Sequence, residues 1–102
     1  METNILVIGR DAAILAVIQR LINAHEGWHA TTVSTEDEAI TALKQRTYSI
    51  VFVSAGFSAQ EEETLRGKLK NIDPQVTVTR HYGGGSGLLE NEILGILQKG
   101  KQ

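Results

Sequence analysis

Three polar residues have side chains that could act together if the fold brings them to one place. Asp11, Ser54 and His81 have the residue types of the orienting acid, nucleophile and base of a hydrolase. However, the sequence around Ser54 lacks the Gly-x-Ser-x-Gly turn that exposes a nucleophile, and no oxyanion hole can be identified. We therefore predict no catalytic residues, and we predict that the protein is not an enzyme.

A glycine-rich loop, Gly83-Gly84-Gly85-Ser86-Gly87, precedes an apolar pattern typical of a helix. Backbone N–H groups at such a place can hold an anion. The loop does not match the dinucleotide fingerprint, which would need glycine at Leu88, and no Gly-Lys-Ser/Thr of a nucleotide phosphate loop occurs. Three interpretations stay open, namely a flexible turn, a loop that binds an anion or phosphate, and a contact for a partner.

The remaining composition argues against several other kinds of site. Gly27 interrupts the pair His25 and His29, so no His-x-x-x-His lies on one helix, and the chain has no cysteine. We expect no metal and no cofactor.

The net charge of −2 over 102 residues lacks the basic excess of a nucleic-acid-binding protein. The apolar run Ile5 to Ile8 is too short for a signal peptide or a membrane span. We expect a cytoplasmic protein with neither nucleic acid nor membrane as a partner.

Apolar runs alternate with amphipathic stretches along the whole chain. The predicted strands are Ile5–Ile8, Trp28–Val33, Tyr48–Val53 and Val76–Arg80. Asp11, the box Thr35-x-x-Glu38 and the box Ser58-x-x-Glu61 predict the starts of three helices, Gly27 predicts the end of the first, and Leu88 to Leu97 predict a fourth helix.

This strict alternation predicts one α/β domain over residues 1–102, with a three-layer, flavodoxin-like parallel sheet and four helices. With the two most apolar strands in the centre, we expect strand order 2-1-3-4. The first and last helices then cover one face, and the second and third cover the other. Ligands of such folds bind where the strand order reverses, at the carboxyl ends of the first and third strands. The residues expected there are Gly9, Arg10, Asp11, Ser54, Ala55 and Gly56, with His81 and Tyr82 beside them.

With these features in this order, the sequence resembles the receiver domain of two-component response regulators. The likeness rests on the first apolar strand, on Val33 to Leu43, on Tyr48 to Phe57 and on Asn71 to Val76. The resemblance implies a signalling function in which two acids after the first strand and an aspartate after the third hold Mg²⁺. A hydroxyl after the fourth strand and a lysine after a fifth strand would contact the phosphoryl group.

Most of that chemistry is missing from this sequence. The two acid positions fall on Gly9 and Arg10, the acceptor falls on Ser54, and no Asp or Glu occurs from Arg46 to Gln60. The lysine is absent, and the usual fourth helix and fifth strand look deleted. Arg10 would place a fixed cation about where the metal would lie, and two cations there would repel. We therefore predict a degenerate, truncated receiver that Mg²⁺ and phosphodonors do not phosphorylate.

The sequence leaves two candidate functions. The first is a phosphorylation-independent interaction module that binds a signalling protein and forms a homodimer through the fourth strand or the terminal helix. The second is a sensor of a small anion or nucleotide. The candidate ligand-binding residues for the sensor are Arg10, Asp11, Ser54, His81, Gly83, Gly84, Gly85 and Ser86.

Overall fold

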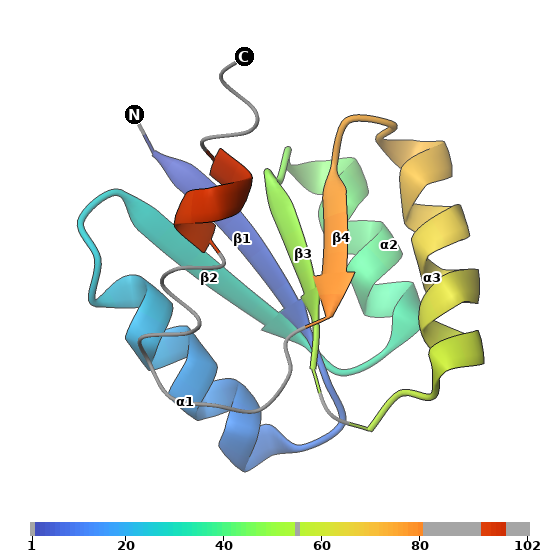
Figure 1. The fold of residues 1–102 in the computed structure, drawn as a ribbon, viewed down its shortest axis with the longest axis horizontal. Coiled ribbons are helices and arrows are strands. Elements are labelled where there is room, and N and C mark those ends of the chain that lie inside the picture. Colours follow the sequence, from blue (N-terminus) through green and yellow to red (C-terminus); the bar gives the residue numbers. More distant parts are fainter. Residues whose placement is uncertain (1, 55, 81–92, 98–102) are drawn as a thin grey trace.

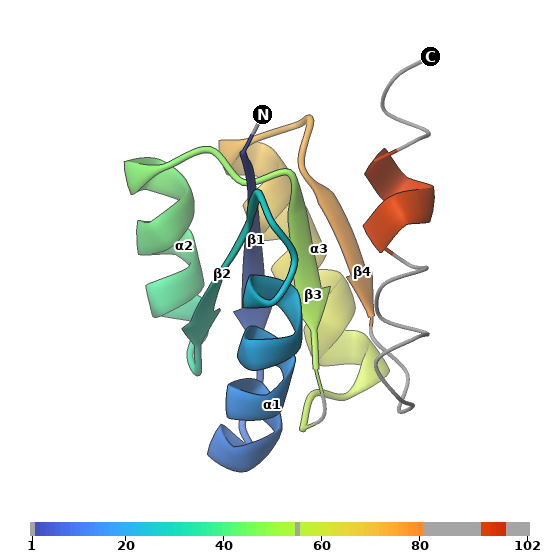
Figure 2. The same cartoon turned by 90° about the vertical axis from the view of Figure 1, so that its left-hand side faces the viewer.

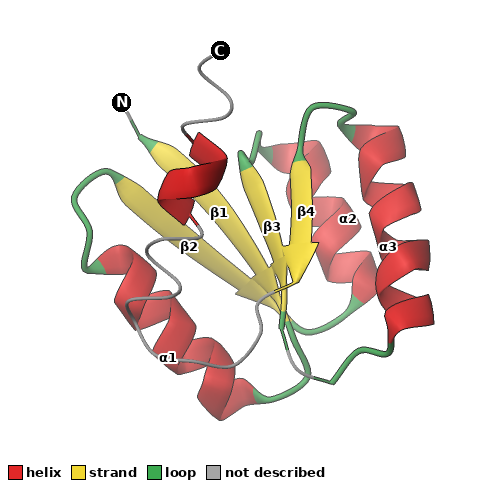
Figure 3. Ribbon diagram, viewed as in Figure 1, coloured by secondary structure: helices red, strands yellow, loops and turns green. Residues whose placement is uncertain are grey.

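The computed structural model describes residues 2–54, 56–80 and 93–97 (Figure 1). The strands are β1 (Thr3–Ile8), β2 (Trp28–Val33), β3 (Ile50–Val53) and β4 (Thr77–Arg80). The helices are α1 (Ala12–Asn23), α2 (Glu36–Gln45) and α3 (Ala59–Ile72), and residues 93–97 are also helical. Figure 3 shows how helices and strands alternate along the chain.

The four strands form one parallel sheet in the order β2-β1-β3-β4, which confirms the predicted fold class and strand order. The register places Ile5 of β1 between Ala30 of β2 and Ile50 of β3. Because β1 and β3 have a neighbour on both sides, their residues from Ile5 and Ile50 onward are fully buried, as continuous apolar runs require.

Two apolar clusters cover the two faces of the sheet. Leu6, Ile8 and Val51 pack with residues of α2 and α3 on one face. Ile5, Val7 and Phe52 pack with residues of α1 and with Ile93 on the other. Figure 2 shows α2 and the segment 93–97 on opposite sides of the sheet. For the described residues this confirms the prediction that the first and last helices cover one face of the sheet and the second and third helices cover the other.

The predicted helix starts are also confirmed. The Asp11 carboxylate accepts hydrogen bonds from the backbone N–H groups of Ala13 and Ile14 at 3.0 and 3.2 Å. Thr35 and Ser58 each form a complete capping box with the glutamate three residues later. None of the helices in residues 2–54, 56–80 and 93–97 is both long enough and apolar enough to span a membrane.

Four predicted boundaries were wrong. β1 begins at Thr3 rather than Ile5, because its first two residues are polar but pair with β2. β3 begins at Ile50 rather than Tyr48, and β4 begins at Thr77 rather than Val76, because Tyr48 and Val76 are apolar but lie before the paired part of each strand. α1 ends at Asn23, and Gly27 does not cap it. Gly27 adopts φ +84° in the turn that leads into β2.

Side chains of α1 close part of the outer edge of β2. The backbone N–H of Ala30 donates to Asn23 Oδ1 at 2.9 Å, and Gln19 Nε2 donates to the carbonyl oxygen of Ala30 at 3.3 Å. Edge strands expose backbone groups that can pair with another chain. At Ala30 both groups are already satisfied within the domain.

Candidate functional site

The carboxyl ends of β1 and β3 meet at the strand-order reversal, and their junction is tightly packed. The N–H of Ser54 donates to the carbonyl oxygen of Ile8 at 2.8 Å, and the N–H of Gly9 donates to that of Val33 at 3.1 Å. Ser54 is only 5% exposed. A Cβ atom added at Gly9 would lie 3.0 Å from the Cβ of Ser54. The Ser54 side chain therefore occupies the space that a side chain at position 9 would need.

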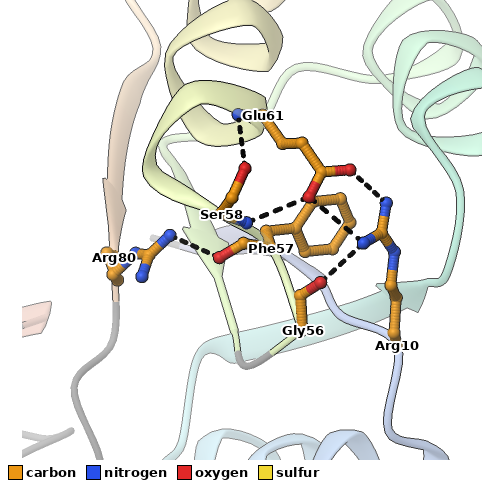
Figure 4. Close-up of polar contacts among 6 residues, drawn as sticks. All are labelled: Arg10, Gly56, Phe57, Ser58, Glu61 and Arg80. Atoms are coloured by element: carbon orange, nitrogen blue, oxygen red, sulfur yellow. Dashed lines mark hydrogen bonds and ion pairs between the residues drawn. The ribbon is translucent and has the colours of Figure 1, made fainter.

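Arg10, the next residue, crosses this edge and binds the loop after β3 (Figure 4). Its Nη1 donates to the carbonyl oxygen of Gly56 at 2.6 Å. The same guanidinium forms a bidentate pair with Glu61, from Nη2 to Oε2 at 2.7 Å and from Nη1 to Oε1 at 3.3 Å. Bidentate arginine–carboxylate pairs fix orientation as well as charge. Arg10 therefore connects the end of β1 to the first turn of α3.

The pair changes the titration of both groups. The hydrogen bond from Arg10, followed by the one from the backbone N–H of Ser58, lowers the pKa of Glu61 to about 2. The hydrogen bond to Glu61 in turn raises the pKa of Arg10. Both side chains are about half exposed, at 50% and 44%, so solvent and salt reach the pair.

The aromatic ring of Phe57 and the backbone of Gly56 complete the surroundings of the Arg10 side chain. The Cζ atom of Arg10 lies 4.3 Å from the centre of the Phe57 ring, within the range of a cation–π interaction. Gly56 has φ +104°, and a Cβ added there would lie 2.9 Å from the Cβ of Arg10. A glycine is therefore needed both for the backbone conformation and for the close approach of Arg10.

A second arginine holds the same loop from the other side. Arg80, at the end of β4, donates from Nη2 to the carbonyl oxygen of Phe57 at 2.7 Å (Figure 4). Its Nε donates to Glu62 Oε1 at 2.9 Å. This pair is more buried than the pair of Arg10 with Glu61. Arg10 thus binds the carbonyl oxygen of Gly56 and pairs with Glu61. Arg80 binds the carbonyl oxygen of the next residue, Phe57, and pairs with Glu62.

An open groove of about 410 Å³ lies beside the Arg10 side chain, between the first turns of α2 and α3. Its lining residues include Arg10, Phe57, Glu36 and Glu61 and the capping residues Thr35 and Ser58. Both first turns are acidic, with Glu36, Asp37 and Glu38 in α2 and Glu61 and Glu62 in α3. The groove is therefore bordered by acidic residues, of which Glu36 is paired with Lys68, with 2.7 Å between Glu36 Oε1 and Lys68 Nζ.

The structure brings only some of the sequence-predicted site residues together. Arg10, Asp11 and Ser54 lie at the expected sheet edge, but Asp11 caps α1 and Ser54 is packed against Gly9. His81, Gly83, Gly84, Gly85 and Ser86 lie outside the described residues, as do Ala55 and Tyr82. No group of three or more His, Cys, Asp or Glu within the described part of the chain comes together as a metal site would require.

The sequence analysis missed the partners of Arg10. Ser58-x-x-Glu61 predicted a capping box, which forms, but the same carboxylate also binds a side chain 51 residues away. A signal was present, because Arg10 follows the first strand and Glu61 opens the helix after the third. The carboxyl ends of neighbouring parallel strands meet at one edge of a sheet, so the topology places these two residues at the same edge, although it does not specify their contact.

Comparison with known proteins gives a clear result for the fold. No protein-family model matches the sequence, and no curated protein matches it. Among solved structures, a two-component response regulator from Clostridium difficile aligns over 99% of this chain and 100% of its own, with a TM-score of 0.80 and 16% identity. The chain has the receiver fold.

Two further receiver domains agree. The receiver domain of the hybrid histidine kinase CckA has a TM-score of 0.78 and 17% identity, over 92% of this chain and 98% of its own. A CheY-like receiver domain from Methylobacillus flagellatus has a TM-score of 0.73 and 16% identity, over 94% and 99%. At this level of identity the receiver fold is established, and the function has to be argued from the residues of the site.

Proposed function

We propose that this protein is a receiver-like signalling module, spanning residues 1–102 and working in the cytoplasm, that binds a protein partner without being phosphorylated. The observation that carries the proposal is the position of Arg10. Its guanidinium lies at the end of β1, within 2.6 Å of a backbone carbonyl oxygen and 2.7 Å of a carboxylate oxygen. Oxygen ligands of this kind are those that Mg²⁺ prefers.

A built-in cation at this place argues against phosphoryl chemistry. In the receiver mechanism that the sequence resemblance implies, carboxylates after β1 and β3 bind Mg²⁺ and accept the phosphoryl group. Here Gly9 and Ser54 occupy two of those positions and are packed against each other, and a cation bound beside Arg10 would be repelled. The receiver fold without this chemistry leaves its surfaces as the means of signalling.

Phosphodonor chemistry tests the proposal directly. The protein is incubated with Mg²⁺ and acetyl phosphate, and its mass is measured before and after treatment with hydroxylamine, which cleaves acyl phosphates. We expect no gain in mass. A gain that hydroxylamine removes would overturn the proposal, and so would a stable gain that is lost in Ser54→Ala.

A homodimer through β4 or the terminal helix is part of this proposal. β4 is the last strand in the described sheet and pairs with β3 on one side. Light scattering after size-exclusion chromatography measures the mass at increasing concentration. A constant monomer mass would contradict the dimer and leave a different protein as the partner.

The second candidate, a sensor of a small anion or nucleotide, finds a specific obstacle in the structure. Arg10, the cation expected to attract the anion, is already paired with Glu61. A thermal-shift screen of phosphates and nucleotides decides between the two functions, since a ligand that binds only the folded state raises its stability. A shift that is lost in Arg10→Ala would favour the sensor.

A further inference from the structure

The contacts around Arg10 have the composition of a recognition site for a guanidinium group. A carbonyl oxygen of Gly56 and both carboxylate oxygens of Glu61 accept its hydrogen bonds, and the Phe57 ring lies against its face. A planar guanidinium, unlike an ammonium, can donate bidentate hydrogen bonds to a carboxylate and stack on an aromatic ring at the same time. In the free protein the chain's own arginine fills this site.

We propose that the site formed by Gly56, Phe57 and Glu61, here called the arginine site, binds an arginine of a basic partner segment after Arg10 moves away. The inference rests on the proposed function, because it names the chemistry of the partner that the module binds. Arg10 then acts as an internal competitor that must be displaced.

The exposure of the pair makes this exchange feasible. Half of the Arg10 side chain and 44% of that of Glu61 are accessible to solvent. Exposed ion pairs contribute little to stability, because water and salt compete with them. Arg80 differs in this respect, since its pair with Glu62 is more buried and holds the same loop in place when Arg10 leaves.

The groove beside the arginine site supplies the charge complementarity for a basic segment. It is open to solvent and adjoins Arg10, and its lining includes Glu61 and also Glu36, which is paired with Lys68. When Arg10 leaves, Glu61 keeps its hydrogen bond from the backbone N–H of Ser58 but loses its cationic partner, so the groove becomes more negative. A segment with several arginines would place one guanidinium in the arginine site and others near the acidic first turns of α2 and α3.

The test titrates isotope-labelled protein with a blocked peptide that contains two arginines among glycines, and with the same peptide containing lysines. Amide chemical shifts of Gly56 and Glu61 report binding at the site. We expect the arginine peptide to bind more tightly than the lysine peptide, and Arg10→Ala to bind it about threefold to fivefold more tightly than the wild type. Arg20→Ala, which removes an exposed arginine in the last turn of α1, should bind like the wild type.

Two further variants keep the test decisive. Glu61→Gln preserves the capping function but removes the charge, so the preference for the arginine peptide should disappear. Glu63→Gln, a change at an exposed glutamate of the same helix, should retain the preference. Arg10→Lys keeps the charge and should have an intermediate affinity. Equal affinities for wild type and Arg10→Ala, equal affinities for the two peptides, or no effect of Glu61→Gln would overturn the proposal. None of these results would alter the phosphodonor assay, so the proposed function is tested separately.

Discussion

Gly9 and Ser54 lie side by side at the ends of β1 and β3, so close that a Cβ on Gly9 would make an unusually tight contact. A Cβ on Gly9 would stand 3.0 Å from the Cβ of Ser54 and 3.1 Å from Cδ2 of Leu15. The leucine side chain can adjust, but the serine Cβ is fixed to the backbone. The packing at the sheet edge therefore depends on glycine at this position.

We predict that Gly9→Ala lowers the free energy of unfolding by about 1–2 kcal/mol through overpacking. Urea denaturation measures the change. Gly67→Ala is the matched control, because Gly67 lies within α3 with open space around it, and alanine there should stabilise by about 0.5–1 kcal/mol. In the Gly9→Ala/Ser54→Gly double variant, part of the loss should be recovered. Simple addition of the two single effects would contradict the proposed contact.

Gly56→Ala should destabilise for a different reason. Its φ of +104° is unfavourable for alanine, and the added Cβ would lie 2.9 Å from the Cβ of Arg10. We expect a loss of about 1–3 kcal/mol, measured by the same denaturation. Arg10→Gly removes the obstructing carbon and should relieve only the steric part of this loss. A Gly56→Ala protein as stable as the wild type would show that the loop can adopt another conformation.

Acid should weaken the contact between Arg10 and Glu61. The folded protein holds the pKa of Glu61 at about 2, below its ordinary value of 4.5, so the unfolded chain binds this proton first as the pH falls. The contribution of Glu61 is therefore complete above about pH 4.5 and is lost as the pH falls toward 2. Unfolding measured across this range should depend less on pH in Glu61→Gln than in the wild type. An unchanged dependence would contradict the lowered pKa.

The β2 edge gives a prediction about association. Gln19→Ala and Asn23→Ala each free one backbone group of Ala30 and should each cost about 0.5–1 kcal/mol of stability. Together they should increase the mass seen by light scattering at high concentration, because an open edge can pair with another chain. Asn71→Ala, in the last turn of α3, serves as the control. A strictly monomeric double variant would show that these side chains do not protect the edge.

Local patterns predicted most of the fold. The apolar runs around Leu6 and Val51 and the caps at Asp11, Thr35 and Ser58 act within a few residues of sequence, so they can be read directly. The starts of β3 and β4 could not be read in this way. Tyr48 and Val76 are as buried as strand residues, and only the pairing register shows that they lie outside the strands.

The site was harder to predict than the fold. The sequence located Arg10 and Ser54 at the correct sheet edge, because topology alone decides which strand ends meet. It did not show that Glu61 would neutralise Arg10, or that Arg80 would bind the carbonyl oxygen of Phe57. These contacts join residues 51 and 23 positions apart and depend on side-chain direction, which no local pattern specifies.

Ile93 is fully buried in the same cluster as Ile5, at the other end of the described chain. That face of the sheet therefore lacks one of its packing residues until the segment around Ile93 has docked. Contacts between residues so far apart in sequence form late and slow the search for the native state. We therefore expect the docking of Ile93 to be a late step of folding, and fragments that stop before Ile93 to expose apolar surface that attracts chaperones and proteases.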